Sequence, residues 1–169
     1  MGTMMPTNNG TEIRLNHPNG LGGWMVLVQI GLYLSVIRLL FLIFSTTIPS
    51  FQPDLWDVLT SPDSSVYDPL WKPALIFEAV VNVTFVLFSI FLLVQMYRKK
   101  ATFPRWIIFY YVTNLIVLII DYVLLANIEL VQQMNEGGSM QDIGRLIISC
   151  AIWVPYFLRS KRVRNTFVN

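Results

Sequence analysis

Four long apolar stretches are the feature of this sequence that most restricts its fold. They cover approximately residues 24–44, 74–97, 106–128 and 141–158. A helix needs about 20 apolar residues, at about 1.5 Å each, to cross the roughly 30 Å hydrocarbon core of a bilayer. Only 13% of the residues are charged, whereas a soluble domain has roughly 25%. We therefore predict an all-α integral membrane protein in which four helices form one bundle.

The polar segments divide the chain into an N-terminal tail, a membrane domain and a C-terminal segment, which is described in the next paragraph. Residues 1–20 lack periodicity, and we predict a flexible cytoplasmic tail there. Residues 21–158 form the membrane domain, with one long external loop at 45–73. Within this loop, a short helix is predicted from Pro53 to Leu59, because proline stands at its first position and an acid in its first turn. This helix could lie on the outer membrane surface, over the mouth of the bundle, or in a solvated loop.

Lysine and arginine residues are concentrated on one side of the predicted bundle. Four follow the second stretch and four follow the fourth stretch: Arg98, Lys99, Lys100 and Arg105, then Arg159, Lys161, Arg162 and Arg164. The connections on the other side are acidic, and Lys72 is their only basic residue. Basic residues are retained in the cytoplasm and attract anionic lipid headgroups. We therefore predict that both termini are cytoplasmic and that residues 159–169 form a basic tail next to the bilayer.

One ionisable residue interrupts each apolar stretch. These residues are Arg38, Glu78, Asp121 and Arg145. Counting at about 1.5 Å per residue places all four roughly 21 to 24 Å from the inner boundary. An unpaired charge at the bilayer centre costs about 2.5–3.5 kcal/mol, so we predict a buried layer in which two acids and two bases cancel. Contact between consecutive helices favours pairing Arg38 with Glu78 and Arg145 with Asp121, but the sequence does not fix the partners.

Two asparagines extend this layer into a polar seam. Asn82 follows Glu78 by one helical turn, and Asn114 precedes Asp121 by two turns, so each pair shares a helix face. Two interpretations are open. The polar groups could hold the helices in register. Alternatively, they could form an ion or proton path, or a pocket for a small polar ligand that opens to the outside.

The sequence carries no recognisable catalytic or cofactor motif. The single His17 and the single Cys150 cannot form an ordinary zinc site. No metalloprotease, nucleophile-elbow, P-loop or dinucleotide-binding pattern occurs. We therefore predict a protein that is not an enzyme and has no catalytic residue, cofactor or metal. Because the basic tail adjoins an apolar stretch, we interpret it as a lipid anchor and predict no nucleic-acid partner.

Three motifs resemble those of a known family. They are Gly20 to Trp24, Phe77-Glu78 with Asn82, and Ile152 to Tyr156, the last followed by Ser160 to Phe167. Together they resemble the YdgK-like family of small bacterial membrane proteins, a domain of unknown function, over residues 20–167. The resemblance implies four spans in a bacterial inner membrane. It brings no activity.

Two hypotheses about function follow from these patterns. The first is an accessory, sensor or scaffold protein whose C-terminal residues Asn165, Thr166 and Phe167 dock a cytoplasmic or membrane protein partner. The second is a small transporter or channel that forms a homo-oligomer and uses the charge layer.

Overall fold

The structure, a computed structural model, describes residues 20–134 and 138–168 of the chain. These residues form helices joined by turns and short loops, and no strand occurs among them. The all-α prediction is therefore confirmed. Except for Gly20, the predicted tail at residues 1–20 lies outside the described residues.

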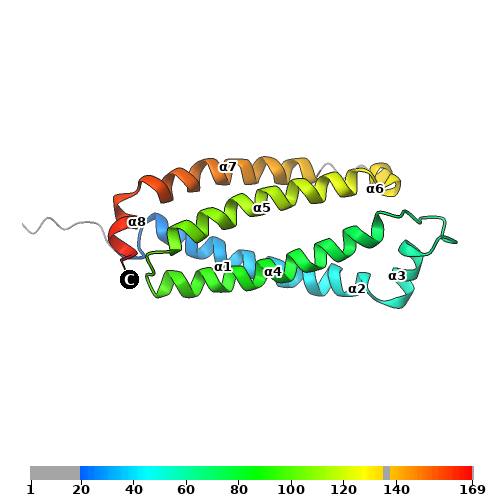
Figure 1. Cartoon of the computed structure of the whole chain (residues 1–169), viewed down its shortest axis with the longest axis horizontal. Coiled ribbons are helices and arrows are strands. Elements are labelled where there is room, and N and C mark those ends of the chain that lie inside the picture. The colour runs from blue at the N-terminus through cyan, green and yellow to red at the C-terminus, as the bar shows by residue number, and fades with distance from the viewer. Residues whose placement is uncertain (1–19, 135–137, 169) are drawn as a thin grey trace, which may run out of the picture.

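Four long helices run along one axis of the molecule (Figure 1). They are α1 (Trp24–Leu42), α4 (Trp71–Tyr97), α5 (Phe103–Ala126) and α7 (Gly138–Arg159). Helix α1 continues through η1 (Ile43–Thr47) and α2 (Ile48–Ser50). The short helices α3 (Pro53–Thr60), α6 (Glu129–Met134) and α8 (Lys161–Thr166) lie at the ends of the long ones. The short helix predicted from Pro53 is confirmed as α3, which packs against α2 and α4.

Three helical segments are long and apolar enough to cross a membrane. They are Trp24–Ser50, Trp71–Tyr97 and Phe103–Ala126. Many of their large apolar side chains point outward, including those of Ile37, Phe41 and Leu87. A continuous apolar surface of this kind suits lipid rather than water, and these helices support a membrane protein. Helix α7, which contains the predicted fourth span, is not one of the three and carries three charged residues, Asp142, Arg145 and Arg159.

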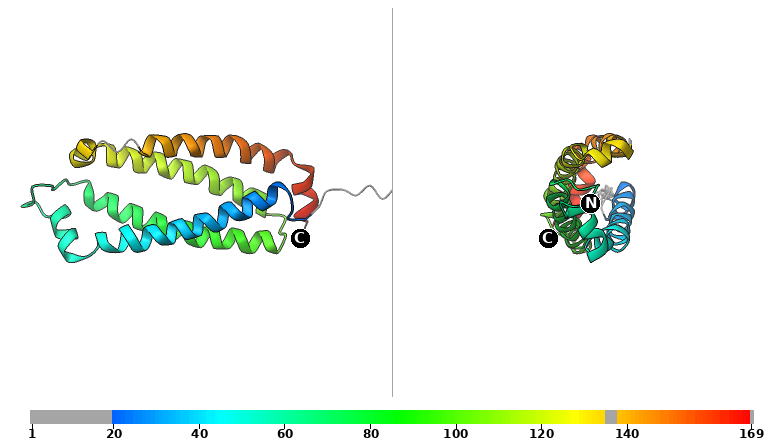
Figure 2. Two further views of the ribbon diagram at one scale, coloured as in Figure 1. Left: turned by 180° about the vertical axis from the view of Figure 1, so that it is seen from behind. Right: turned by 90° about the vertical axis from the view of Figure 1, so that its right-hand side faces the viewer.

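The long helices pack in the order of the chain. Helix α1 packs against α4, α4 against α5, and α5 against α7. The pairs α1/α4 and α5/α7 lie close together at the end that carries α8 and diverge toward the end that carries α3 and α6 (Figures 1 and 2). Between α1 and α7, the first and last of the long helices, Trp24 and Trp153 meet edge to face with ring centroids 6.3 Å apart.

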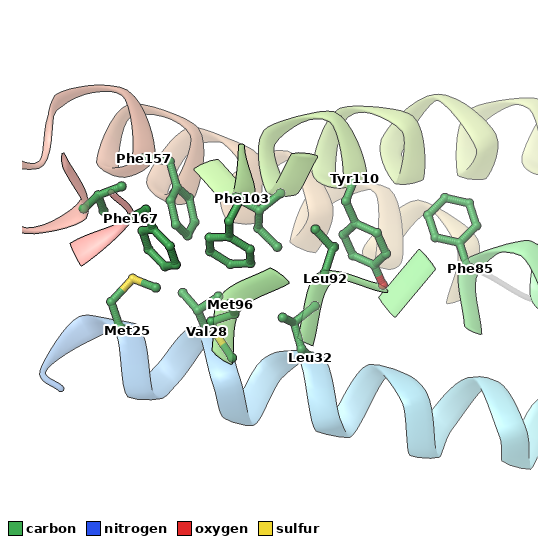
Figure 3. Packing of buried hydrophobic residues seen from close by; sticks show 12 residues of the cluster. Met25, Val28, Leu32, Phe85, Leu92, Met96, Phe103, Tyr110, Phe157 and Phe167 are labelled. Atoms are coloured by element: carbon green, nitrogen blue, oxygen red, sulfur yellow. The ribbon is translucent and has the colours of Figure 1, made fainter. Parts of the chain in front are cut away.

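The apolar core lies at the end where the two pairs converge (Figure 3). Its members come from all four long helices and from the C-terminal segment: Met25, Val28, Leu32, Phe85, Leu92, Met96, Phe103, Ile107, Tyr110, Phe157, Val163 and Phe167. Phe103 is fully buried between two aromatic rings. It meets Phe157 edge to face at 5.9 Å and stacks on Phe167 at 4.6 Å. Such aromatic pairs contribute beyond the area they bury, so this end is the firmly packed part of the fold.

The first helical segment runs further than the predicted span 24–44. The polar run after Phe44 suggested the start of a loop, yet the helix continues to Ser50 with a π-helical section at η1. The Ser50 hydroxyl donates to the carbonyl oxygen of Thr46, 2.8 Å away, and the Thr47 hydroxyl accepts from Asn82. Hydroxyl groups that find such partners can remain within a helix.

The predicted basic tail at 159–169 is instead part of the folded domain. Helix α8 begins after Ser160, whose hydroxyl accepts from the backbone N–H of Val163. Val163, Thr166 and Phe167 are buried. Thr166 and Phe167 are therefore used within the chain, and of the three residues expected to dock a partner only Asn165 is exposed.

Hydrogen bonds join the C-terminal segment to the residues just before α1. The backbone N–H of Gly20 donates to the Thr166 hydroxyl at 2.9 Å, and Arg162 donates from Nε to the Gly20 carbonyl at 3.4 Å. Gly23 has a φ of 63°, and a Cβ there would lie 2.6 Å from Nη1 of Arg162. A Cβ at Gly22 would lie 3.2 Å from Nη2 of Arg162, so Gly22 and Gly23 let the chain pass closely beneath α8.

Candidate ligand pocket

A cavity of about 520 Å³ lies between the four long helices. We call it the central cavity. Charged and amide side chains that line it are Arg38 from α1, Glu78 and Asn82 from α4, Asn114 and Asp121 from α5, and Asp142 from α7. Its wall also includes the aromatic side chains of Phe77, Phe85, Tyr110 and Tyr111. The central cavity therefore combines charged and aromatic groups, the mixture that orients ligands in protein pockets.

Three of the four residues of the predicted charge layer line this cavity. Arg38, Glu78 and Asp121 come from three different helices, and both predicted seam residues, Asn82 and Asn114, lie with them. Among the described residues, no ion pair joins Arg38 to either carboxylate. Glu78 on α4 and Asp121 on α5 line the same cavity as Arg38 on α1. The charges thus surround a space instead of closing on one another.

Arg145, the fourth residue of the predicted layer, does not line the central cavity. Its Nη1 lies 2.9 Å from Oδ1 of Asp142, and the two side chains are 74% and 37% exposed, respectively. The predicted pairing of Arg145 with Asp121 is therefore wrong. A spacing of three residues places Asp142 and Arg145 on the same helix face, so the pair forms without help from another helix.

This local pair changes the predicted charge balance. With Arg145 and Asp142 paired to each other, one cation, Arg38, faces two carboxylates, Glu78 and Asp121, in the central cavity. The predicted complete cancellation is therefore wrong for this group, since it retains one excess carboxylate. A half-buried site with an excess of carboxylate acceptors favours a positively charged occupant.

Asn82 connects the cavity wall to the first helical segment. The residue is buried, and its Nδ2 donates to the Thr47 hydroxyl at 3.3 Å. Asn82 lies one turn after Glu78 on α4, and both residues line the central cavity. Its hydrogen bond therefore fixes α4 against η1 beside the cavity wall.

Two aromatic side chains of the wall come from α4 and α5. Phe85 and Tyr110 meet edge to face at 5.3 Å, and the Tyr110 hydroxyl accepts from Ser89 at 3.0 Å. Both rings belong to the apolar core and to the cavity lining. Phe85 and Ser89 follow Glu78 and Asn82 at spacings of three and four residues, so the sequence indicates one helix face for all four, whereas it gives no signal for Tyr110.

A second cavity of about 510 Å³ lies between α1, α5 and α7. We call it the side cavity. It is lined by Arg145 and Ser149, and by five residues that also line the central cavity: Arg38, Asn114, Leu118, Asp142 and Leu146. This shared lining places the two cavities next to each other on the side where α1 and α7 are neighbours.

The remaining predicted residues lie away from both cavities. Arg159, Lys161 and Arg164 are exposed around α8, whereas Arg162 is half-buried against Gly20. Within residues 20–134 and 138–168, no cluster of three histidine, cysteine, aspartate or glutamate side chains is placed to hold a metal ion.

Comparison with known proteins identifies a family. The family described as "Protein of unknown function (DUF2569)" matches residues 18–168, which is nearly the whole chain. Neither the curated proteins nor the solved structures give a match.

Proposed function

The chain belongs to the DUF2569 family of proteins of unknown function, and we propose that it is a non-enzymatic membrane protein that binds a small amine-bearing ligand in the central cavity. Binding at this site gives it the role of a sensor or accessory protein. The excess carboxylate of the group formed by Arg38, Glu78 and Asp121 is the observation that carries the proposal.

The chemistry of the wall supports an organic cation. Glu78 and Asp121 offer charged acceptors to an ammonium group, and such hydrogen bonds are stronger than neutral ones. The faces of Phe85 and Tyr110 supply apolar surface, and aromatic faces also attract cations. The volume of about 520 Å³ falls within the range of roughly 300–1,000 Å³ that is typical of small-molecule sites.

The packing beside the central cavity favours binding over a permanent channel. Leu92, Met96 and Phe103 have no exposed surface at the convergent end of the bundle, and they belong to the same core as Phe85 and Tyr110. An open conduit would need polar groups and water through this region. The site is therefore a pocket with one closed end.

We propose that four helices cross a bacterial inner membrane, with both termini in the cytoplasm. The residues supporting this orientation are the exposed cations at the α8 end, since basic residues are retained on the cytoplasmic side. Helix α7 has 22 residues, enough at about 1.5 Å each to cross the hydrocarbon core. This orientation places the central cavity in the outer half of the bilayer.

Calorimetric titration of the purified full chain in detergent tests the ligand class. The probes are phenethylamine and 2-phenylethanol, which differ in the charged group. We expect the amine to bind at least about tenfold tighter, and we expect Glu78→Gln or Asp121→Asn to remove this preference. Asp57→Asn on the exposed side of α3 is the control. Equal binding of the two probes would refute the proposal.

A transporter is the second candidate, because the cavity carries charged side chains from separate helices that could separate during transport. A transporter predicts that the wild-type chain takes up amine into proteoliposomes and that Glu78→Gln abolishes this uptake. Phenethylamine should still protect the wild-type chain from unfolding. Binding without uptake would favour the sensor or accessory role.

A further inference from the structure

The central cavity is bordered by α1 and α7, which belong to different packed pairs of helices. Helix α1 packs on α4 and α7 packs on α5, and the side cavity lies between α1 and α7, bounded by α5. The two cavities share Arg38 and Asp142 in their lining. A molecule seated in the central cavity can therefore extend sideways past Arg38.

The helices that border this side carry apolar surfaces. Ile37 and Phe41 on α1, and Ile152 on α7, are exposed. In a membrane protein, such surfaces contact the acyl chains of the lipid. The side cavity thus adjoins the bilayer, so that an occupant with acyl chains can keep them in lipid.

The charges along this route follow a fixed order. Arg145 lines the side cavity alone and is paired with Asp142, which, like Arg38, lines both cavities; Glu78 and Asp121 line the central cavity alone. With Asp142 and Arg145 neutralising each other, the unpaired charges run inward from the cation of Arg38 to the carboxylates of Glu78 and Asp121. A phospholipid with an amine head has the matching order, because its phosphate lies between the acyl chains and the terminal ammonium group.

We propose that the central cavity holds the headgroup of a phospholipid that carries a primary amine, inserted sideways between α1 and α7. This inference rests on the proposed function, since it assigns the amine to the same carboxylates. The ammonium group lies at Glu78 and Asp121, and the phosphate lies at Arg38. Arginine suits this role because its planar guanidinium group can donate two hydrogen bonds to one phosphate. Among the described residues, Arg38 has no ion-pair partner that would compete.

Native mass spectrometry of the delipidated full chain tests the proposal. The probes are phosphatidylethanolamine, phosphatidylglycerol, which has the same phosphate but no amine, and soluble O-phosphoethanolamine. We expect phosphatidylethanolamine to bind at least about tenfold tighter than phosphatidylglycerol. Arg38→Gln should weaken phosphatidylethanolamine binding about tenfold, whereas Arg105→Gln, which lines neither cavity, should not.

A steric pair of variants tests the sideways route and does not depend on losing a charge. Ser149 lines the side cavity but not the central one, and the neighbouring Ile148 is exposed. Ser149→Phe should lower phosphatidylethanolamine occupancy, and Ile148→Phe should leave it unchanged.

If Arg38→Gln does not fold, Arg38→Lys, which keeps the charge, should retain the lipid preference.

The outcomes separate this inference from the proposed function. Tight binding of phenethylamine or O-phosphoethanolamine with no preference between the two lipids would overturn the lipid headgroup and keep the amine site. Equal occupancy in Ser149→Phe and Ile148→Phe would overturn the sideways route. Failure of every amine probe would refute both proposals.

Discussion

Phe167 stacks on Phe103 with 4.6 Å between the ring centroids and 27° between the planes. This contact places the C-terminal segment against the first turn of α5. It also explains why the segment folds although it is rich in cations. Its apolar members are spaced to reach the core, while Arg159, Lys161 and Arg164 stay exposed.

Removing this ring should destabilise the whole domain. Phe167 is 5% exposed, and truncating a buried phenylalanine to alanine typically costs about 3–5 kcal/mol. We expect Phe167→Ala to lower the free energy of unfolding by about 3 kcal/mol, measured by denaturant titration in detergent. Val168→Ala, at a position that is 68% exposed, is the control. Equal losses for the two variants would show that Phe167 is not anchored.

The amide of Asn82 should stabilise the π-helical section η1 of the first helical segment. It donates to the buried Thr47 hydroxyl at 3.3 Å, and hydrogen bonds between membrane helices contribute about 0.6 kcal/mol on average and about 1.7 at most. We expect Thr47→Val to lower the free energy of unfolding by about 1 kcal/mol. Thr84→Val is a matched control, because that exposed hydroxyl bonds only the carbonyl of Val80 on its own helix. A larger loss in the control would rule out the interhelical role.

Gly23 should tolerate a side chain poorly. Its φ of 63° lies in the left-handed region, and a Cβ would press against Arg162. We expect Gly23→Ala to lower the free energy of unfolding by about 1–2 kcal/mol, mainly through backbone strain. Gly31→Ala is the control, since a Cβ there meets nothing within 4 Å and alanine is the better helix former. If Gly23→Ala also stabilises the chain, the close passage beneath α8 is incorrect.

Hydropathy and spacing predict the long helices and most of the candidate site. Apolar stretches indicate where helices form, and counting residues along them predicts a similar membrane depth for Arg38, Glu78 and Asp121. In the structure these three residues line one cavity. The partners in ion pairs are harder to predict from the sequence, because they depend on side-chain direction and on which helices touch. Asp142 stands three residues before Arg145, a spacing visible in the sequence, but the sequence does not show that this local pair forms in place of an interhelical one.

The packing of the α8 segment is hidden in the sequence for a different reason. Its cations dominate the composition and obscure Val163, Thr166 and Phe167, whose spacing of three and four residues is that of a helix face. The polar residues in and after η1 likewise suggest a loop, although they are helical, because their hydroxyl groups find hydrogen-bond partners within the fold. In both segments, average polarity conceals a few residues that pack.

The pair formed by Asp142 and Arg145 should contribute little to stability. Both side chains are partly exposed, and an ion pair at this spacing contributes about 0.3–0.5 kcal/mol. We expect a double-mutant cycle on Asp142→Asn and Arg145→Gln to give a coupling of that size. The matching cycle on Asp121→Asn and Arg145→Gln should give a coupling close to zero. Strong coupling in the second cycle would restore the interhelical pairing predicted from the sequence.

The contact between Phe167 and Phe103 also predicts the topology of the fourth helix. It holds the C-terminal segment at the end of the bundle where α4 connects to α5, so α7 must return to that end. In a Cys150→Ser background, we expect Lys99→Cys and Lys161→Cys to resist a membrane-impermeant thiol reagent applied outside intact cells. Ser65→Cys and Gln132→Cys, at the opposite end, should react. Labelling of Lys161→Cys from outside would mean that α7 does not complete a fourth crossing, and labelling of both lysine positions would mean that the orientation is reversed.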